Sequence, residues 1–285
     1  MNSSHIPFAE IVDHLDIKAG DLLLVASDIL MLSLEERRIK KRLNPSLFID
    51  SFIRKLGQNG TLLFPAFSWD HGGQYNIKTA QPTTGGLPRI ALERNDFSRT
   101  THPIHSFVVT GKYQEELCRL ENESSFGPDS PFAFLHQHHA KMLIIGLDYQ
   151  RSFTFVHYVE EHEQVPYRYM KHYTTEYIDY EGKSSIKKFS FYARHSGIYN
   201  DVNPIGKILE KKGISEERVI NNVGFILLDL HQAFDEIQKD IRYNKGRNLH
   251  CRFLKKAMKK VVRVSVQKGK KYLKRITGGR RQSAF

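Results

Sequence analysis

Long apolar runs are missing from this chain of 285 residues. No stretch of about 18 apolar residues occurs, so we expect no membrane-spanning helix. The amino terminus has no basic segment followed by a long apolar stretch, so we expect no signal peptide and a cytoplasmic protein. Cysteine is also scarce, and Cys118 and Cys251 fall in segments predicted to be helical, without Cys-x-x-Cys spacing. We therefore expect two reduced thiols and neither a disulfide nor a zinc site.

Acidic residues are absent from the last part of the chain. Residues 241–285 hold 16 of the 43 Lys and Arg and none of the 31 Asp and Glu, which leaves residues 1–240 with 27 basic and 31 acidic residues. The net charge of +12 is therefore confined to the end of the chain, and the remainder carries −4. A mildly acidic body with a basic end predicts two parts with different partners. We divide the chain into an α/β domain, 1–245, and a basic amphipathic tail, 246–285.

The basic tail has the pattern of an amphipathic helix. Between Arg247 and Gln267, apolar residues fall on one broad helical face and Lys and Arg on the other, and a second basic cluster runs from Lys268 to Arg275. This pattern is typical of a helix that lies on a membrane surface, and we predict docking on an anionic cytoplasmic leaflet. A helix that packs its apolar face on the body is the alternative. Few aromatic residues interleave with the basic ones, so a nucleic-acid surface is not expected.

The order of apolar segments predicts an α/β fold. Short apolar runs indicate strands, and amphipathic stretches between them indicate helices. Expected strands cover 21–25, 61–64, 107–110, 142–145 and 219–228, and expected helices cover 7–15, 45–56, 113–120, 205–211 and 230–243. This alternation favours a mostly parallel, mixed sheet flanked by helices. Two segments rich in aromatic and β-branched residues, 167–180 and 186–192, flank a Glu-Gly-Lys turn and predict an added antiparallel hairpin.

The chemistry is predicted where the buried strand 142–145 gives way to a helix. Ligands bind at the carboxyl ends of strands in open α/β sheets, and Thr154, His157 and Glu160 follow this strand three residues apart, on one helical face. His157 is therefore a candidate general base, with Glu160 as the carboxylate that holds its ring. A solvated His–Glu pair is the alternative. Zinc is not expected, because His157 and His162 are five residues apart and two histidines on one helical face need a spacing of four.

Three further segments carry polar residues at places where ligands bind. Ser27 and Asp28 follow the first strand, and a phosphate group could bind the backbone there if a helix begins, although a plain helix cap is the alternative. Residues 65–88 form a long irregular loop around the single tryptophan, Trp69, and long loops in compact domains are usually functional. The segment 99–106 makes a stiff polar turn that contains two histidines and a serine.

Four segments together, in this order and spacing, resemble the aminoglycoside 3-N-acetyltransferase family. They are Gly-Asp-Leu-Leu-Leu-Val at 20–25, Gly-Thr-Leu-Leu-Phe-Pro-Ala-Phe-Ser-Trp-Asp at 60–70, Arg-Thr-Thr-His-Pro-Ile-His-Ser at 99–106 and Thr-Phe-Val-His-Tyr-Val-Glu at 154–160. The resemblance implies an acetyltransferase that uses acetyl-coenzyme A as co-substrate and transfers the acetyl group directly. It implies His157 as the base, Glu160 as its partner and Thr154 as a nearby hydroxyl.

The resemblance also implies which residues bind the two substrates. Residues expected to help bind coenzyme A are Ser27, Asp28, His102 and Ser106, and those expected on the acceptor side are Trp69, Asp70 and Arg89. Two departures from the family pattern matter. The family's His-Ser-Ser is Ala26-Ser27-Asp28 in this chain, which puts an aspartate at the pyrophosphate site. Arg89 stands where a glutamate is expected, which disfavours polycationic aminoglycosides and favours neutral or anionic acceptors.

These observations predict the function. We expect an acetyl-coenzyme A-dependent N-acetyltransferase that acts on an amino sugar, and we favour a surface-polysaccharide precursor over an aminoglycoside antibiotic. The alternative, suggested by Ala26 and Asp28, is a catalytically weakened member of the family that acts as a binding or scaffold protein through its basic tail. No metal is expected, and the sequence leaves the acceptor and the oligomeric state open.

Overall fold

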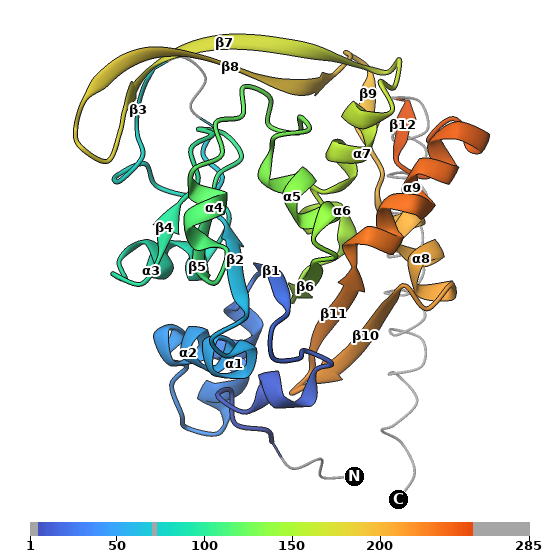
Figure 1. The fold of residues 1–285 in the computed structure, drawn as a ribbon. Helices are drawn as coiled ribbons and strands as arrows, with labels where there is room; N and C mark the ends of the chain where they lie inside the picture. Colours follow the sequence, from blue (N-terminus) through green and yellow to red (C-terminus); the bar gives the residue numbers. More distant parts are fainter. Residues whose placement is uncertain (1–4, 70–72, 253–285) are drawn as a thin grey trace, which may run out of the picture.

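A seven-stranded sheet forms the centre of the protein (Figure 1). The computed structural model describes residues 5–69 and 73–252. The strands follow the order β10-β11-β6-β1-β2-β5-β4. Their bounds are Leu22–Ser27 (β1), Thr61–Pro65 (β2), Ser98–Arg99 (β4), Phe107–Gly111 (β5), Lys141–Ile145 (β6), Ser215–Ile220 (β10) and Val223–Asp229 (β11).

The direction of the strands matches the predicted mixed sheet. At its centre, β1 lies between β2 and β6 and is parallel to both. β5 pairs antiparallel with β2 and β4, and β11 pairs antiparallel with β6 and β10. Five strands therefore point one way and two the other, which confirms the mostly parallel α/β sheet.

Helices cover both faces of this sheet because its central strands are apolar on both faces, and β1 and β2 are buried along their whole length. The helices are Leu30–Arg38 (α1), Pro45–Leu56 (α2), Gly86–Leu92 (α3), Gln114–Cys118 (α4), Pro131–Gln137 (α5), Tyr149–Ser152 (α6), Val156–His162 (α7), Asn203–Lys211 (α8) and Leu230–Asn244 (α9). One apolar cluster joins the sheet to α1, α2 and α3, and a second joins it to α5, α7 and α9. The sheet is therefore the middle layer of three.

A second, smaller sheet contains the predicted antiparallel hairpin. Strand β7, Arg168–Ile178, pairs with β8, Ser184–Arg194, along its whole length, and β3, Gln74–Asn76, adds a third strand parallel to β7. Figure 1 shows this hairpin arching across the end of the molecule that lies opposite α1 and α2. The hairpin is confirmed, and its two longest strands bring residues far apart in the sequence to one end of the body.

Two segments differ from the expected elements. The segment 219–228, expected as one strand, is part of a hairpin of β10 and β11, because Asn221 and Asn222 adopt left-handed φ values of 48° and 62° and reverse the chain. Asparagine tolerates this conformation better than most residues. The helix expected at 7–15 is shorter, a 3₁₀ helix at Ile11–His14.

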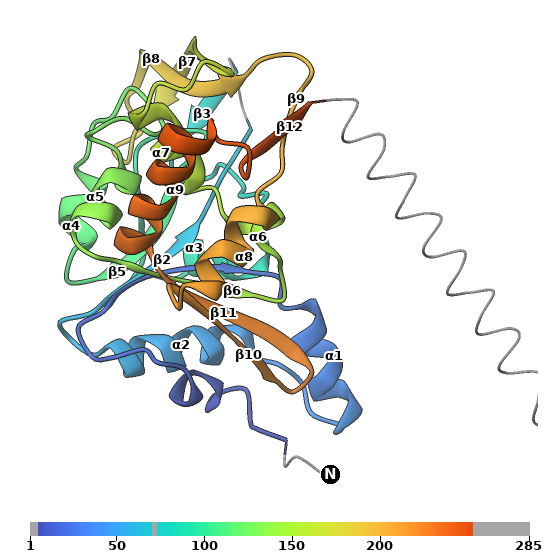
Figure 2. The same ribbon diagram turned by 90° about the vertical axis from the view of Figure 1, so that its right-hand side faces the viewer.

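The chain after α9 also differs from the prediction. The helix expected from Arg247 does not begin there, because His250–Arg252 form strand β12, which pairs antiparallel with β9, Ile198–Asn200. Figure 2 shows β12 and β9 side by side. Leu249, expected on the apolar face of that helix, is 1% exposed and belongs to the core. Cys251 therefore lies in a strand, and the rest of the expected helix lies outside the described residues.

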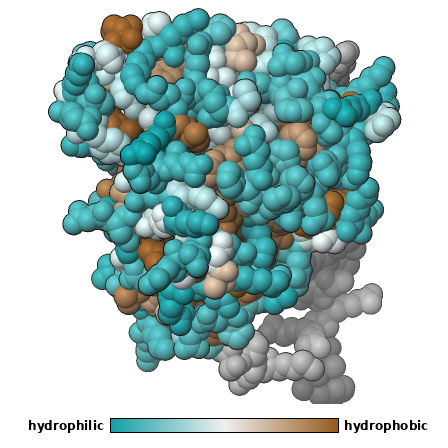
Figure 3. Space-filling view, viewed as in Figure 1, coloured by the Kyte–Doolittle hydropathy of each residue, from teal (hydrophilic) through white to brown (hydrophobic). Residues whose placement is uncertain are grey.

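The exposed surface is mainly polar. Figure 3 shows a face on which hydrophilic residues predominate and apolar residues are scattered. Among the described residues, no helix combines the length and the apolar character that crossing a membrane requires.

Candidate active site

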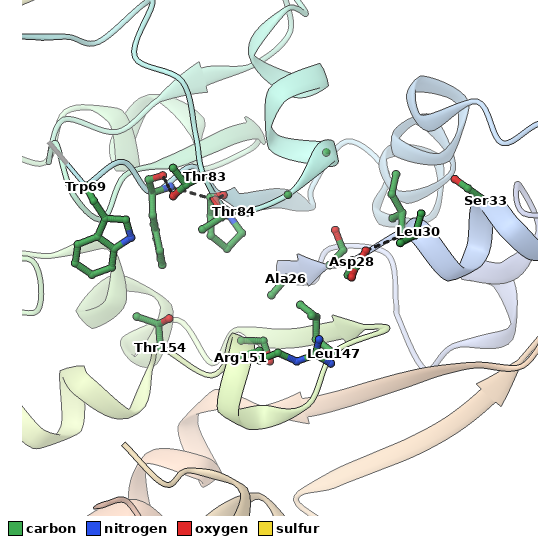
Figure 4. Close-up of a pocket in the computed structure, with 17 residues that line it drawn as sticks. Ala26, Asp28, Leu30, Ser33, Trp69, Thr83, Thr84, Leu147, Arg151 and Thr154 are labelled. Carbon is green, nitrogen blue, oxygen red and sulfur yellow. Dashed lines mark hydrogen bonds between the residues drawn. The ribbon is translucent and has the colours of Figure 1, made fainter. Parts of the chain in front are cut away.

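A first cavity of about 750 Å³ lies where the chain leaves β1, β2 and β6. Its lining includes Ser27 and Asp28 at the end of β1, Thr83 to Gly86 at the beginning of α3, and Leu147 after β6. Figure 4 shows Trp69 and Thr154 toward one end of this cavity and Asp28 toward the other. The cavity lies at the carboxyl ends of these strands, the position at which open α/β sheets bind ligands.

Two glycines allow the backbone to pass close to the turn after β1. Gly85 has φ 109°, and a Cβ atom there would lie 2.8 Å from the carbonyl oxygen of Ser27. Gly146 has φ 66°, and its Cβ atom would lie 2.5 Å from the carbonyl oxygen of Asp28. Both distances are too short for real side chains, so both positions require glycine. The backbone around the turn after β1 is therefore closely packed.

The charged residues of the first cavity are Asp28 and Arg151. Asp28 Oδ1 accepts a hydrogen bond from the Leu30 N–H, 3.0 Å away, at the beginning of α1 (Figure 4). The helix that the phosphate interpretation requires is thus present, but its first free N–H already has a carboxylate partner. Arg151 Nε donates to Asp148 Oδ1 at 3.0 Å, and its side chain is more than half exposed.

A second cavity, of about 550 Å³, lies below the β7–β8 hairpin and contains His157. Its lining also includes Phe126, Arg168 and Asn200. Trp69 lines both cavities, whereas Thr154 lines the first and His157 the second. Thr154 and His157, which are three residues apart in the sequence, therefore line two adjoining cavities.

His157 and Glu160 form a tight pair on α7, with His157 Nδ1 and Glu160 Oε2 2.6 Å apart. The side chain of His157 is 15% exposed and that of Glu160 is 1% exposed, so the alternative of a solvated pair is wrong. Arg168, at the start of β7, forms an ion pair with Glu160 in which Nε lies 2.6 Å from the same Oε2. A buried carboxylate is stable when it is paired in this way.

The protonation of this group follows from its contacts. The pKa of Glu160 is lowered, because His157 and Arg168 outweigh the opposing effect of its burial, so the carboxyl group is ionised. Nδ1 lies 2.6 Å from this ionised oxygen and 2.9 Å from Arg168 Nη2. The shorter contact, with the carboxylate, favours a proton on Nδ1 and the lone pair on Nε2. The pKa of His157 is lowered by its burial and then by Arg168, so the ring is neutral near pH 7. A neutral ring with its lone pair on Nε2 can accept a proton.

Asn200, at the end of β9, completes the group. Its Nδ2 donates to His157 Nε2 at 3.2 Å, and its Oδ1 accepts from Arg168 Nη2 at 2.8 Å. Arg168 Nη1 also donates to the carbonyl oxygen of Tyr192 at 3.0 Å, which ties the group to β8. Strands β7, β8 and β9 therefore hold the side chains around the ring of His157.

Thr154 does not share the face of α7 with His157, contrary to the prediction. It lies in the turn between α6 and α7, and its carbonyl oxygen accepts the backbone N–H of His157 at 3.0 Å. The helix begins two residues later, at Val156. The Thr154 side chain therefore lines the first cavity, whereas the imidazole of His157 lines the second.

His102 and Ser106 lie inside the protein and line neither cavity. Both are fully buried. His102 Nδ1 accepts the backbone N–H of Ile104 at 3.2 Å, and burial lowers the pKa of His102 to about 4. Ser106 Oγ donates to the Ala66 carbonyl oxygen at 2.9 Å and accepts from the buried Arg99. These residues stabilise the turn behind the cavities.

The predicted acceptor residues lie in different places. Trp69 lies at the junction of the cavities, and Asp70 lies outside the described residues. Arg89 is exposed on α3, donates to the Pro82 carbonyl oxygen at 3.1 Å and lines neither cavity. Arg168, Asn200 and Arg151 were missed by sequence reasoning.

No sequence signal links these missed residues to His157. Arg168 reaches the ring from a strand 11 residues further on, and Asn200 from 43 residues further on. In the described part of the chain, no three His, Cys, Asp or Glu side chains gather in a way that could hold a metal ion.

Comparisons with known proteins give a fold and a family. The structure is similar to aminoglycoside acetyltransferase AAC(3)-IIb (TM-score 0.70, 18% identity, 83% of this chain and 96% of that one). It is similar to AAC-IIIb in a binary complex with CoASH (TM-score 0.68, 17% identity, 83% of this chain and 95% of that one) and to AAC-VIa bound to sisomicin (TM-score 0.68, 17% identity, 83% of this chain and 96% of that one). At these identities the likeness concerns the fold. No curated protein matches the chain in sequence.

The family is shown by its sequence model. The model of aminoglycoside 3-N-acetyltransferase matches residues 40–242, which is well over half of the chain. The match covers the strands from β2 to β11, which include the hairpin of β7 and β8, and it also covers the pair on α7. As the four sequence segments predicted, the chain belongs to the aminoglycoside 3-N-acetyltransferase family.

Proposed function

We propose that the protein is an acetyl-coenzyme A-dependent N-acetyltransferase that acetylates the amine of a small-molecule amino sugar. A surface-polysaccharide precursor is favoured over an aminoglycoside antibiotic. The observation that carries the proposal is the neutral His157, held by Glu160 and Arg168 in the second cavity, which shares Trp69 with the first. One cavity can hold the acetyl donor and the other the acceptor, so that the base lies where the two meet.

The first cavity fits coenzyme A. Its volume of about 750 Å³ is within the usual range for small-molecule sites, and the backbone at Gly85 and Gly86 is open to a ligand. Arg151 is the cation of this cavity and the candidate partner of the pyrophosphate. AAC-IIIb, which has the same fold, was solved with CoASH, and this supports coenzyme A as a ligand of this protein. Ser27 remains a candidate contact, and His102 and Ser106 act by supporting the wall.

The transfer needs one base and no protein nucleophile. The lone pair of the amine attacks the thioester carbonyl carbon, and His157 Nε2 takes a proton from the amine nitrogen. The C–S bond breaks, and the imidazolium returns the proton to the sulfur, so that the products are an amide and a thiol. Glu160 stabilises the imidazolium in between. The hydroxyl of Thr154, in the first cavity, is a candidate donor to the oxygen that carries the developing negative charge.

A thiol-release assay with acetyl-coenzyme A and a panel of amino sugars, nucleotide-linked amino sugars and aminoglycosides tests the proposal. His157→Gln should lower kcat by roughly 100- to 10,000-fold, because general-base catalysis contributes on that scale. The matched control is His162→Gln, on the same helix but exposed and outside the second cavity, which should keep full activity. Undiminished turnover in His157→Gln would remove His157 from the mechanism.

A second candidate function is a binding or scaffold protein that has lost the reaction. It is favoured by Asp28, whose carboxylate occupies the N–H at the start of α1 where a phosphate would otherwise bind. Calorimetry separates the two candidates, since the acetyltransferase should bind coenzyme A with a dissociation constant in the micromolar range. Absence of binding at millimolar coenzyme A would favour the scaffold.

A further inference from the structure

The second cavity is lined by cations, and no Asp or Glu among the described residues lines it. Its charged residues are Arg168, Lys171 and Arg194. Arg168 is neutralised by Glu160, but Lys171 and Arg194 form no ion pair with any described residue. His195 lies beside them in the lining. The cavity wall formed by the hairpin therefore carries positive charge that no acidic side chain among the described residues neutralises.

The pairing of β7 with β8 places two of these cations opposite each other, which is unfavourable when no ligand is bound. Arg168 and Arg194 are direct partners in the register of β7 and β8. Like charges directly opposite each other destabilise an antiparallel pair. Arg194 instead donates to the Ile198 carbonyl oxygen at 2.5 Å and stacks over the ring of Tyr199, with 5.1 Å between guanidinium and ring centre. These contacts orient the guanidinium without removing its charge.

An anionic ligand would neutralise the positive charge of Lys171 and Arg194. Arginine binds phosphoryl groups through two parallel charge-assisted hydrogen bonds, and lysine adds a point charge. Lys171 on β7 and Arg194 on β8 line the same cavity, three positions apart in the register of the hairpin. His195 offers a further ring N–H. Three such donors suit a tetrahedral group with two negative charges better than a single carboxylate.

We infer that the acceptor is a phosphorylated amino sugar, whose phosphoryl group binds Lys171, Arg194 and His195 while its amine reaches His157. The inference rests on the proposed function and specifies its substrate class. A polycationic aminoglycoside would bring its ammonium groups beside the same cations and would be repelled. Selection against such acceptors thus resides in the hairpin, whereas Arg89, which the sequence suggested for this role, lies outside both cavities.

Calorimetry on the full chain, with the first cavity saturated by coenzyme A, tests the binding. The probes are glucosamine, glucosamine 1-phosphate and UDP-glucosamine, and the last two distinguish a sugar phosphate from a nucleotide-linked sugar. We expect at least one phosphorylated probe to bind on the order of tenfold or more tightly than glucosamine, and less so at high salt. In the double variant Lys171→Gln/Arg194→Gln, this ratio should fall toward one.

The matched control is Lys183→Gln, which removes a cation from the exposed turn of the same hairpin and should keep the ratio. Equal binding of all three probes, or no binding of either phosphorylated probe at millimolar concentration, would overturn the inference.

Thiol release from acetyl-coenzyme A, measured with the same probes, separates the inference from the proposed function. Phosphate-dependent binding without thiol release upholds the anionic acceptor site and overturns acetyl transfer. Thiol release that is independent of the phosphate upholds acetyl transfer and overturns the inference.

Discussion

His157 Nδ1 and Glu160 Oε2 lie 2.6 Å apart on α7, and the carboxylate is 1% exposed. Because the pKa of Glu160 is held low by His157 and Arg168, the carboxylate fixes the imidazole in the tautomer with its lone pair on Nε2. The ring and the carboxylate therefore act as one unit. The burial of the ring, which lowers the pKa of His157, keeps that unit ready to accept a proton at neutral pH.

We expect His157 to titrate below pH 6.5, its ordinary pKa. Only the neutral ring accepts a proton, so kcat/KM should hold as the pH falls to 6.5 and decline only when it passes the lowered pKa. Arg194 is one of the cations that lower this pKa, so Arg194→Gln should raise it. An NMR titration of the imidazole signals, with His157→Gln to assign the resonance, measures both. A His157 pKa above 6.5 in the unaltered protein would contradict the geometry.

Glu160→Gln should reduce activity and stability together. A glutamine amide can donate to Nδ1 and favour the wrong tautomer, so we expect kcat to fall by roughly 100- to 10,000-fold. The change also leaves the buried Arg168 without its carboxylate, and removing one partner of a buried pair costs about 3–5 kcal/mol. Steady-state kinetics and urea unfolding give the two values. Full stability with lost activity would mean that Arg168 finds another partner.

Gly85→Ala and Gly86→Ala form a matched pair in the wall of the first cavity. Gly85 has φ 109° and ψ −174°, a region almost restricted to glycine, so alanine there should cost about 1–3 kcal/mol and push against the Ser27 carbonyl oxygen. At Gly86 a Cβ atom would lie 3.7 Å from Ile29 Cδ1, an ordinary contact. We expect Gly85→Ala to lower the unfolding free energy and the affinity for coenzyme A, and Gly86→Ala to retain the unfolding free energy. Equal stability of both variants would refute this reading of the wall.

Much of the fold could be predicted from the sequence because its signals are local. A run such as Met142 to Ile145, ended by a glycine, marks a buried strand, and the spacing of His157 and Glu160 places them on one side of a helix. The dyad was found because both partners lie within one turn. The same reasoning failed for Thr154, since a one-turn spacing does not reveal where the helix begins.

The remainder of the site depends on contacts between distant strands. Nothing in the neighbourhood of Arg168 or Asn200 in the sequence indicates that β7 and β9 bring both side chains to the ring of His157. The hairpin itself was predicted, but its register, which sets Arg168 against Arg194, was not. In the same way, Asn221 and Asn222 were sufficient to reverse the chain within a segment whose apolar residues suggested one strand.

The docking of residues 246–285 on an anionic membrane, and with it a cytoplasmic protein bound peripherally at the inner surface, stays a prediction, because 253–285 lie outside the described residues. We expect the full chain to sediment with anionic vesicles and not with neutral ones, and to do so less at high salt. A chain that ends at Arg252 should stay in the supernatant. Equal sedimentation of the two forms, or no preference for anionic lipid, would rule the docking out.

Strand β12 lies close to the candidate base, His157. His250 pairs with Asn200, whose side chain contacts His157, so the last described strand is only one strand away from the base. The change in charge near residue 245 therefore does not mark the end of the described structure, which continues through β12 to Arg252. A truncation at residue 245, chosen from the change in charge, would delete β12 and the buried Leu249. Damage to the enzyme would then be attributed wrongly to the loss of the tail.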